Sequence, residues 1–371
     1  MSGNFDLAVV GAGICGLAHA LAAARRGKKV VVIDRDAQAN GASIRNFGFV
    51  TVTGQQQGAC WRRAMRSRDV WAEIAGPAGI DVAHRGMVMA VRRPEAAAVL
   101  KAFRNTDMGE DCELIGPAAA RERFPYLREV AAALVSPHEI RVESRKAIPQ
   151  LAKWLAEARG VEFRRGTAVH DVAPPEIATS GGTIHAEAAV VCPGDDFTGL
   201  FRERLATYDL TRCKLHMLRI APPAATIGTA VMSDLGLVRY LGYADLPEAA
   251  ALRRVLEAEQ PDHLAHGIHL IVVRSADGSL VVGDSHHYAA TPDPFAPEEV
   301  DALILDEFRA VLAVGETRVV ERWTGTYASA PDRLMLVDRP ADAIRVVVIT
   351  SGTGASTSFA VAEEVVRDLF G

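Results

Sequence analysis

The sequence predicts a mixed α/β protein, α+β overall, with one domain on a parallel sheet and a second, discontinuous domain on an antiparallel sheet. Three observations favour this fold. The chain opens with an apolar segment, a glycine-rich turn, an alanine-rich segment and another apolar segment. A second glycine-rich turn precedes a helical pattern near the C-terminus. Between these ends, several segments alternate apolar and polar residues, as strands with one covered face do.

The first unit of the chain joins two predicted parallel strands through a helix. Residues 5–10 form an apolar run that is typical of a buried parallel strand. The alanine- and leucine-rich segment 17–26 predicts a helix, and Gly27 is placed to end it. Residues 30–33 read Val-Val-Val-Ile, which predicts the second strand. This order is that of a βαβ unit.

The turn and the end of the second strand carry the residues of a dinucleotide site. Gly11 permits a tight turn, Gly13 lets the backbone approach a pyrophosphate, and Gly16 allows close helix–strand packing. The helix N-terminus supplies unpaired N–H groups for phosphate. Asp34 ends the strand at the spacing expected for a ribose contact, with Arg35 beside it. We therefore predict a Rossmann-like dinucleotide-binding domain rather than a plain βαβ turn.

The composition indicates a globular protein without attraction to polyanions. The chain has 371 residues, 49% apolar and 23% charged, so two domains with a sizeable core are expected. The formal net charge of −5 gives no drive toward nucleic acid or anionic membrane. Four arginines at helical spacing fit a solvated helical face: Arg62, Arg63, Arg66 and Arg68. Neither a signal peptide nor a membrane-spanning run is predicted, so we expect a cytoplasmic protein.

The segment after Asp34 indicates which dinucleotide is bound. Residues 40–48 read Asn-Gly-Ala-Ser-Ile-Arg-Asn-Phe-Gly, which alone also fits an ordinary loop. The segment resembles the second flavin-contact segment of the FAD-dependent D-amino-acid oxidase, glycine oxidase and sarcosine oxidase superfamily. The resemblance implies that Ser43 and Arg45 lie near the pyrophosphate, and that Asn46 and Gly48 lie near the isoalloxazine. FAD is the expected cofactor.

Later segments extend this resemblance over nearly the whole chain. Residues 188–194 are similar to the strand by which the family's chain returns to the cofactor, and residues 166–169 to the strand that contacts adenine. A predicted strand at 345–349, a glycine-rich loop at 350–357 and a helix at 359–369 follow. The resemblance implies that this helix directs its positive end at the flavin, where charge builds up on reduction. Candidate contacts are Val169, Gly194, Gly352, Gly354, Ala355 and Ser356.

The cysteines favour non-covalent FAD and no metal. Sarcosine oxidases of this superfamily attach flavin through a cysteine shortly before a Pro-Asp pair, and residues 323–332 here contain none. No C-x-x-C pair occurs, which argues against a disulfide framework or structural zinc, and an odd number of separated thiols fits a reducing cytosol. The five cysteines are Cys15, Cys60, Cys112, Cys192 and Cys213.

The same stretch departs from the family's amino-acid oxidases. Glycine and D-amino-acid oxidases have an arginine here that clamps the substrate carboxylate, whereas this chain has Tyr327. A phenol cannot replace a bidentate guanidinium, so an ordinary α-amino acid is less favoured as the predicted substrate.

The remaining segments predict a substrate domain threaded between the cofactor segments. Alternating residues predict strands at 215–220, 236–243 and 269–273, which suit an antiparallel sheet. We therefore expect an FAD-binding domain from residues 1–80, 145–205 and 320–371, and a substrate-binding domain from residues 81–144 and 206–319.

Polar residues in and after these strands are candidates for substrate binding. Arg239 and Tyr240 lie in Leu-Val-Arg-Tyr, and His286 follows the predicted strand 280–283. The arginine also fits a solvent-facing strand position, and the histidine also fits a turn or a cap. No metal site is expected, because adjacent strand side chains such as His286 and His287 point to opposite faces.

Four segments together resemble a subgroup of these oxidases that is associated with phosphonate breakdown: residues 45–48, 53–55, 136–143 and 283–286. The resemblance implies oxidation of the C–N bond of 2-aminoethylphosphonate or its N-methyl derivative to an aldehyde, with amine and hydrogen peroxide released. A phosphonate dianion needs several donors, and the candidates are Arg239, Arg45, His286, Tyr327 and Tyr240. No catalytic residue is assigned.

Other functions share the FAD motifs. A glycine- or sarcosine-type amino acid oxidase differs in its substrate, and a flavin dehydrogenase passes electrons to an acceptor other than dioxygen. A non-catalytic FAD-binding subunit is the third alternative, against which the polar residues in the predicted substrate strands argue. The expected partners are a small amine and dioxygen.

Overall fold

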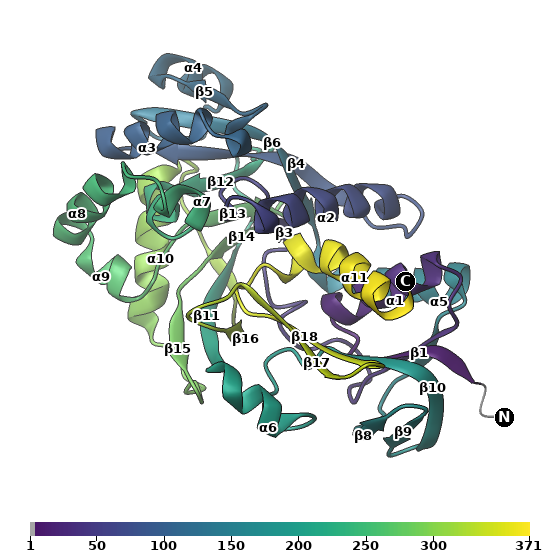
Figure 1. Ribbon diagram of the computed structural model, residues 1–371. Helices are drawn as coiled ribbons and strands as arrows, with labels where there is room; N and C mark the ends of the chain where they lie inside the picture. The colour runs from purple at the N-terminus through teal and green to yellow at the C-terminus, as the bar shows by residue number, and fades with distance from the viewer. Residues whose placement is uncertain (1–3) are drawn as a thin grey trace.

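The computed structural model describes residues 4–371, whose strands form two sheets. Figure 1 shows the eight-stranded sheet near both chain ends and the ten-stranded sheet on the other side of the molecule. The chain crosses between the two sheets several times, because each sheet contains early, middle and late strands. Each sheet is therefore assembled from segments that lie far apart in the sequence.

The eight-stranded sheet contains the predicted parallel strands. Its order is β17-β18-β10-β1-β2-β7, and β8 and β9 extend β10 as an antiparallel ribbon. Strands β18, β10, β1, β2 and β7 run parallel, so their carboxyl ends share one edge. The bounds are Phe5–Val10 (β1), Val30–Ile33 (β2), Glu162–Arg164 (β7), Val169–Ala173 (β8), Glu176–Thr179 (β9), Gly182–Val191 (β10), Met335–Ala341 (β17) and Ile344–Ile349 (β18).

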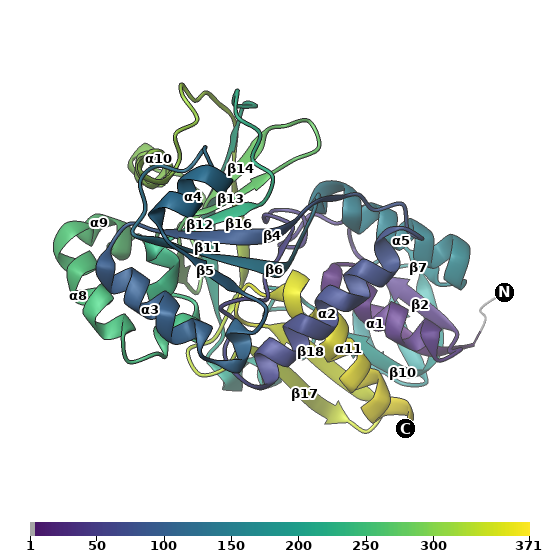
Figure 2. The ribbon, with the colours of Figure 1, turned by 90° about the horizontal axis from the view of Figure 1, so that it is seen from above.

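A layer of helices packs on this sheet around a shared apolar core. Helix α1 contacts α5 and α11, and α2 lies on α11, as Figure 2 shows from above. Trp71 of α2 meets Phe359 of α11 edge to face, with ring centroids 5.1 Å apart. Arg66 of α2 bonds to Glu363 of α11, so the predicted arginine face is paired rather than only solvated. The bounds are Ile14–Arg25 (α1), Ala59–Ala75 (α2), Ser144–Arg159 (α5) and Gly354–Phe370 (α11).

Both glycine-turn helices begin earlier than predicted. Helix α1 begins at Ile14 and α11 at Gly354, directly at their glycine turns. The first turn of α11 reads Gly-Ala-Ser-Thr-Ser, which has little intrinsic helix propensity. Ser356 and Ser358 are only 1% and 0% exposed, so packing against neighbouring helices stabilises this turn.

The ten-stranded sheet is mostly antiparallel and holds the larger core. Its order is β15-β11-β14-β13-β12-β4-β6-β3, with β16 on β11 and β5 on β6, and only β12 and β4 pair in parallel. The strands are Phe49–Val50 (β3), Val82–Val91 (β4), Glu113–Ile115 (β5), Ala132–Val142 (β6), Thr211–Ile220 (β11), Ala230–Ser233 (β12), Ile271–Arg274 (β13), Leu280–Gly283 (β14), His287–Ala289 (β15) and Val319–Ser329 (β16).

Short helices connect and cover this second sheet. Within residues 4–371, every helix is too short or too polar to span a lipid bilayer. The α-helices are Pro94–Arg104 (α3), Pro117–Arg123 (α4), Arg202–Leu205 (α6), Leu241–Ala244 (α7), Ala249–Glu259 (α8), Pro261–Ala265 (α9) and Glu298–Val311 (α10); the 3₁₀-helices are Asp107–Gly109 (η1), Ala206–Tyr208 (η2) and Asp234–Val238 (η3).

Two strands depart from the expected division of the chain. Strands β3 and β16 lie in segments that we expected in the FAD-binding domain, yet both pair within the ten-stranded sheet. Strand β16 runs beside β11 along its whole length, from Thr211↔Ser329 to Ile220↔Val319. The residue pattern of one strand does not indicate which distant strand it pairs with.

The prediction of a strand at residues 236–243 is wrong. This segment forms η3 and α7 instead. Asp234, which is 0% exposed, accepts a hydrogen bond from the backbone N–H of Arg92 at 2.9 Å and pairs with Arg93 at 2.8 Å. These contacts fix the start of η3 directly after β12. Leu237 is also 0% exposed, so the apolar residues here reflect burial of a short helix.

Candidate functional site

A cavity of about 650 Å³ lies at the shared carboxyl edge of the parallel strands. Val10, Ile33, Val191 and Ile349, at the ends of β1, β2, β10 and β18, all line it. The ten-stranded sheet contributes further lining residues from β11, β13 and β16. Ligands of open α/β sheets bind in the crevice at this edge.

The glycine turn after β1 forms one wall of the cavity. Gly11 has a φ of +104°, and a Cβ there would lie 2.5 Å from the carbonyl oxygen of Cys192. A Cβ at Gly16 would overlap the carbonyl oxygen of Gly11. The turn therefore requires glycine at both positions for its own packing. Gly13, between them, also lines the cavity.

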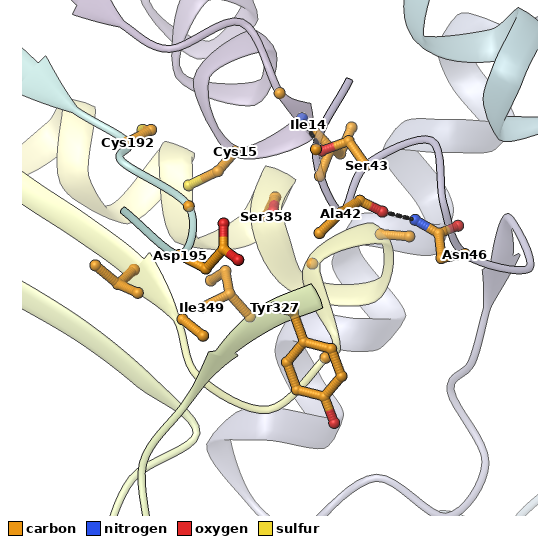
Figure 3. Close-up of a pocket in the computed structure, with 18 of the residues that line it drawn as sticks. Ile14, Cys15, Ala42, Ser43, Asn46, Cys192, Asp195, Tyr327, Ile349 and Ser358 are labelled. Atoms are coloured by element: carbon orange, nitrogen blue, oxygen red, sulfur yellow. Dashed lines mark hydrogen bonds between the residues drawn. The ribbon is translucent and has the colours of Figure 1, made fainter. Parts of the chain in front are cut away.

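Ser43 joins the segment after β2 to this turn. Its hydroxyl accepts a hydrogen bond from the backbone N–H of Ile14 at 2.9 Å, and Figure 3 shows the two residues together. A Cβ at Gly13 would lie 2.9 Å from that hydroxyl. The absent side chain of Gly13 thus leaves room for Ser43 beside the start of α1.

Asp34 and Arg35 lie at the end of β2. Asp34 accepts hydrogen bonds from the backbone N–H of Ala12 at 2.6 Å and of Asp36 at 2.8 Å, which fix its carboxylate at the cavity wall. Arg35 pairs with Asp196, which follows β10, at 2.6 Å. This ion pair links the loops on either side of β1.

The segment after Ser43 is held largely by its own contacts. Asn46 donates to the carbonyl of Ala42 at 2.7 Å (Figure 3), and it accepts a hydrogen bond from the backbone N–H of Gly48 at 2.6 Å. Arg45 donates to Asn40 at 3.1 Å, so its guanidinium is directed along its own segment. Arg45 and Asn46 line the cavity, whereas Gly48 is not among the lining residues. A Cβ at Gly48 would overlap the carbonyl oxygen of Val142 of β6.

The C-terminal glycine turn brings a second helix N-terminus to the cavity. Gly352 has a φ of +70°, and a Cβ there would lie 3.0 Å from the ring of Tyr327. A Cβ at Gly354 would lie 3.5 Å from the side chain of Ile14, so the first turns of α11 and α1 adjoin. Further candidate residues from this turn and from the neighbouring loops line the cavity: Ala355, Ser356, Val169 and Gly194.

This donor set fits a dinucleotide. Helices α1 and α11 both begin at the cavity, and neither has an acidic side chain in its first turn. Their positive ends and unpaired N–H groups suit phosphate and a flavin that gains negative charge. Side chains at Gly11 or Gly16 would collide with the backbone that forms this cradle.

The structure also brings together two cysteines that are far apart in sequence. Cys15 of α1 and Cys192 after β10 both line the cavity (Figure 3). Their sulfur atoms and a nitrogen of His19 lie within 4.8 Å of one another. His19 Nδ1 donates to the carbonyl oxygen of Cys15 at 2.7 Å. The neighbouring Cys15 sulfur, together with burial, raises the pKa of the Cys192 thiol well above its ordinary value. No spacing motif in the sequence indicates this pair.

The predicted substrate-binding residues converge on the part of the cavity that faces the ten-stranded sheet. Arg239 lies at the bend between η3 and α7 and donates to the hydroxyl of Tyr288 at 2.9 Å. The rings of His286 and Tyr327 lie 6.5 Å apart. Tyr240, Arg239, His286 and Tyr327 all line the cavity. Burial raises the pKa of Tyr327 well above its ordinary value, so this phenol stays a neutral donor.

Two ionisable residues in this part of the cavity were not predicted. Asp284 Oδ1 lies 3.2 Å from His269 Nδ1, and Asp284 Oδ2 lies 3.7 Å from His286 Nε2. Burial raises the pKa of Asp284 to about 8, against the opposing effect of Arg239. Burial, assisted by Arg239, lowers the pKa of both histidines well below the ordinary value. An acidic residue directly after a buried strand, as Asp284 is after β14, is the signal that could have found it.

Adjacent histidines point apart, as predicted. His286 lines the cavity, whereas His287 Nε2 lies 2.9 Å from His266 Nδ1. The histidine that joins Asp284 and His286 is instead His269, from the segment before β13. These three side chains offer ligand atoms within 4.8 Å of one another.

Comparisons with known proteins agree with this geometry. Residues 6–367 match the family described as FAD dependent oxidoreductase. The chain is 22% identical over 346 residues to the bifunctional protein ThiO/ThiG of Nostoc sp. (strain PCC 7120 / SAG 25.82 / UTEX 2576), with 90% of this chain and 47% of that protein covered. The chain thus spans about half the length of the curated relatives it matches.

Solved structures share the fold over nearly the whole chain. Glycine oxidase from Geobacillus kaustophilus has a TM-score of 0.77 at 19% identity, covering 99% of this chain and 94% of that chain. L-proline dehydrogenase from P. horikoshii has a TM-score of 0.79 at 20% identity, covering 100% and 94%. Identities this low establish the fold alone. The family match, however, extends over residues 6–367, so this protein belongs to the FAD dependent oxidoreductase (DAO) family and binds FAD.

Proposed function

We propose that this protein is an FAD-dependent amine oxidase acting on a small aminophosphonate, 2-aminoethylphosphonate or its N-methyl derivative. The observation that carries the proposal is the group of donors around Arg239. Its guanidinium donates to the hydroxyl of Tyr288 at 2.9 Å, and the next residue, Tyr240, also lines the cavity. A guanidinium fork with flanking hydroxyls suits a tetrahedral anion, whose three oxygens diverge.

The residue at the family's carboxylate-clamp position supports the same substrate. Tyr327 occupies that position on β16 and lies against Gly352. A neutral phenol donates one hydrogen bond and carries no charge, so it cannot hold a carboxylate bidentately. We infer that Arg239, from a different element, binds the anionic group of the substrate.

The protein's own contribution to catalysis is binding, orientation and exclusion of water. Bound FAD supplies the hydride acceptor for C–N oxidation. Arg239 anchors the anionic end of the substrate, and the apolar residues Phe47, Leu215 and Ile271 line the cavity between the two sheets. Fixing one end of a short substrate limits which carbon reaches the reacting position. Hydrolysis of the imine product then releases an aldehyde, with ammonia from the primary amine or methylamine from its N-methyl derivative.

Anaerobic reduction of the purified yellow protein tests the activity. The flavin absorbance is followed with a panel of aminophosphonates, amino acids and simple amines. Bleaching by 2-aminoethylphosphonate or its N-methyl form, at lower concentration than by N-methylglycine, is the expected result. Preference for N-methylglycine would instead establish the second candidate, a glycine- or sarcosine-type oxidase, which Arg239 as a carboxylate partner also permits.

Two further measurements define the reaction. With the N-methyl substrate we expect phosphonoacetaldehyde and methylamine by NMR, because oxidation is proposed at the chain carbon. Formaldehyde as the main product would place oxidation at the methyl carbon.

Oxygen uptake with peroxide formation identifies an oxidase, whereas rapid dye reduction without peroxide identifies a dehydrogenase with another acceptor.

A further inference from the structure

Three buried ionisable side chains form a connected group at the cavity. Asp284 lies between His269 and His286, at 3.2 Å from the Nδ1 of His269 and 3.7 Å from the Nε2 of His286. The side chains of the three are 6%, 3% and 5% exposed, respectively, and all line the cavity. His286 is a candidate donor to the substrate anion, but no role has been given to Asp284 or His269. Their arrangement therefore needs its own explanation.

The hydrogen-bond partners of the histidines define where protons lie. His286 Nδ1 lies 2.9 Å from the carbonyl oxygen of Gly267, so this nitrogen must donate. The Nε2 of neutral His286, which faces Asp284, is then an acceptor. His269 Nε2 lies 3.4 Å from the hydroxyl of Tyr240, and His269 Nδ1 faces Asp284. An acceptor nitrogen facing Asp284 favours the protonated form of this carboxyl at rest, and the carboxylate forms as the pH rises.

We propose that Asp284 accepts the ammonium proton of the substrate, with His269 and His286 as positioning residues. The inference rests on the proposed function. The step is a proton transfer without a change of electrons: R–NH₃⁺ and the Asp284 carboxylate become R–NH₂ and the Asp284 carboxyl. The N–H bond breaks, an O–H bond forms on Asp284, and the amine keeps the lone pair that C–N oxidation needs.

The charges on the cavity wall favour Asp284 for this role. The other acidic lining residues follow β2 or β10, in the segments that carry the predicted dinucleotide contacts Asp34 and Gly194: Asp34, Asp36, Asp195 and Asp196. Among residues 4–371, the remaining acidic residue that lines the cavity is Asp284, which directly follows β14 of the ten-stranded sheet. An amine whose anionic end lies at Arg239 therefore places its cationic end by Asp284. Opposite charges a few ångströms apart inside a protein attract more strongly than in water.

The surroundings of Asp284 also explain how the proton is held. The ionisable groups that interact electrostatically with the Asp284 carboxyl or lie next to it are Arg239, Tyr240, Cys213, His269 and His286. Of these groups only Arg239 is a fixed cation. Its charge lowers the pKa of Asp284, but burial raises that pKa by more, so that it lies at about 8. A carboxyl in such surroundings can release or take up a proton near neutral pH, as a general base must.

Infrared spectroscopy tests the group without any turnover. Holoenzyme is titrated from pH 6 to 10, and Asp284→Asn is compared with Asp342→Asn, whose side chain is 98% exposed. A protonated-carboxyl band is expected at pH 6, lost with a midpoint near pH 8 in wild type and in Asp342→Asn, and absent from Asp284→Asn. No such band at pH 6 would overturn the proposal. So would a stoichiometric bound divalent metal, because two histidines and a carboxylate also suit a metal ion.

The kinetic arm uses the anaerobic rate of flavin reduction across the same pH range. In wild type the apparent second-order rate constant should rise with a midpoint near pH 8 and level off above it. In Asp284→Asn it should fall about 100-fold or more at pH 7 and continue to rise towards the pKa of the amine itself. Asp284→Glu should restore part of the wild-type profile. His269→Gln should shift the midpoint, which a purely structural role would not do.

The two arms separate this inference from the proposed function. Wild-type protein that no amine reduces refutes the proposed function, while the infrared titration still decides whether Asp284 holds a proton. Wild type and Asp284→Asn with equal rates and superimposable pH profiles refute the proton-acceptor role and leave the proposed function standing. Retained FAD absorbance shows that each variant is folded.

Discussion

The hydroxyl of Ser43 accepts a hydrogen bond from the backbone N–H of Ile14 at 2.9 Å, which ties the segment after β2 to the first residue of α1. The two residues are 29 positions apart, so the bond closes a loop around the glycine turn. Ser43 thus plays the part of an N-cap side chain although it lies outside the helix segment, because its hydroxyl satisfies one of the free N–H groups at the start of α1. The candidate pyrophosphate site is therefore built by two segments that support each other.

Ser43→Ala should weaken both folding and cofactor binding. Loss of a capping bond costs about 1 kcal/mol, which lowers Tm by roughly 2 °C in a chain of this size. The dissociation constant for FAD should rise several-fold, measured by fluorescence quenching on titration into apoprotein. Thr106→Ala, which removes a hydroxyl bond to the backbone of α3, should lower Tm similarly with unchanged FAD affinity. An unchanged FAD affinity in Ser43→Ala would contradict the role in the cofactor site.

Gly16→Ala should prevent assembly of the glycine turn. Its Cβ would overlap the carbonyl oxygen of Gly11, and backbone cannot yield as a flexible side chain can. We expect protein that is purified without yellow colour, or a yield too low to purify. Gly76→Ala is the matched control, because Gly76 has helical dihedral angles and no atom within 4 Å of the added Cβ. Full flavin content in Gly16→Ala would show that the turn tolerates a side chain.

The sequence predicts best what is fixed locally. Gly11, Gly16 and the strand ends at Val10 and Ile33 lie where expected, because each depends on neighbours within one βαβ unit. Asp34 also lies at the cavity wall, since its place follows from the strand that it ends. Short-range geometry of this kind leaves a pattern in the residues themselves.

Contacts between distant segments leave no such pattern. Cys15 and Cys192 meet only because β1 and β10 are neighbours in the sheet. Asp284 joins His269 only because β13 and β14 form a hairpin whose ends approach each other. The sequence predicts a strand at 236–243 where short helices form, because burial of these helices requires apolar residues that a strand would also have. Its candidates Arg239 and Tyr240 nevertheless line the cavity.

FAD should be released by acid precipitation. Cys213 lies directly opposite Tyr327 in the β11–β16 pairing but is 0% exposed and is not among the residues that line the cavity. A covalent bond to flavin would require that sulfur to reach the cavity. We expect a yellow supernatant and a colourless pellet from wild type, and the same from Cys213→Ser. A yellow pellet in wild type only would assign a covalent link to Cys213.

Asp284→Asn should be more stable than wild type at alkaline pH. The folded-state pKa of Asp284, about 8, lies above its ordinary value of 3.8. Between these values the unfolded chain is ionised while the folded protein keeps the proton, so stability is lost as pH rises, by up to ~1.4 kcal/mol per pH unit. Asparagine does not ionise. The Tm advantage of the variant should therefore grow from pH 5 to pH 8, whereas Asp342→Asn should show a constant offset. Parallel Tm curves for wild type and Asp284→Asn would contradict the raised pKa.

Arg239→Gln should weaken binding of anionic amines selectively. Arg239 lies on the cavity wall with Tyr288, and a charge-assisted bidentate pair contributes roughly 1.5–3 kcal/mol, or about 10- to 100-fold in affinity. We expect KM for N-methyl-2-aminoethylphosphonate to rise by that factor, with little change for N-methylpropylamine, which has no anion. Arg239→Lys should recover only part of the loss, because an ammonium lacks the planar fork. Arg254→Gln removes an equal charge from the exposed face of α8 and should behave as wild type. Equal losses for the anionic and the neutral amine would mean that Arg239 supports the fold of the cavity rather than the substrate.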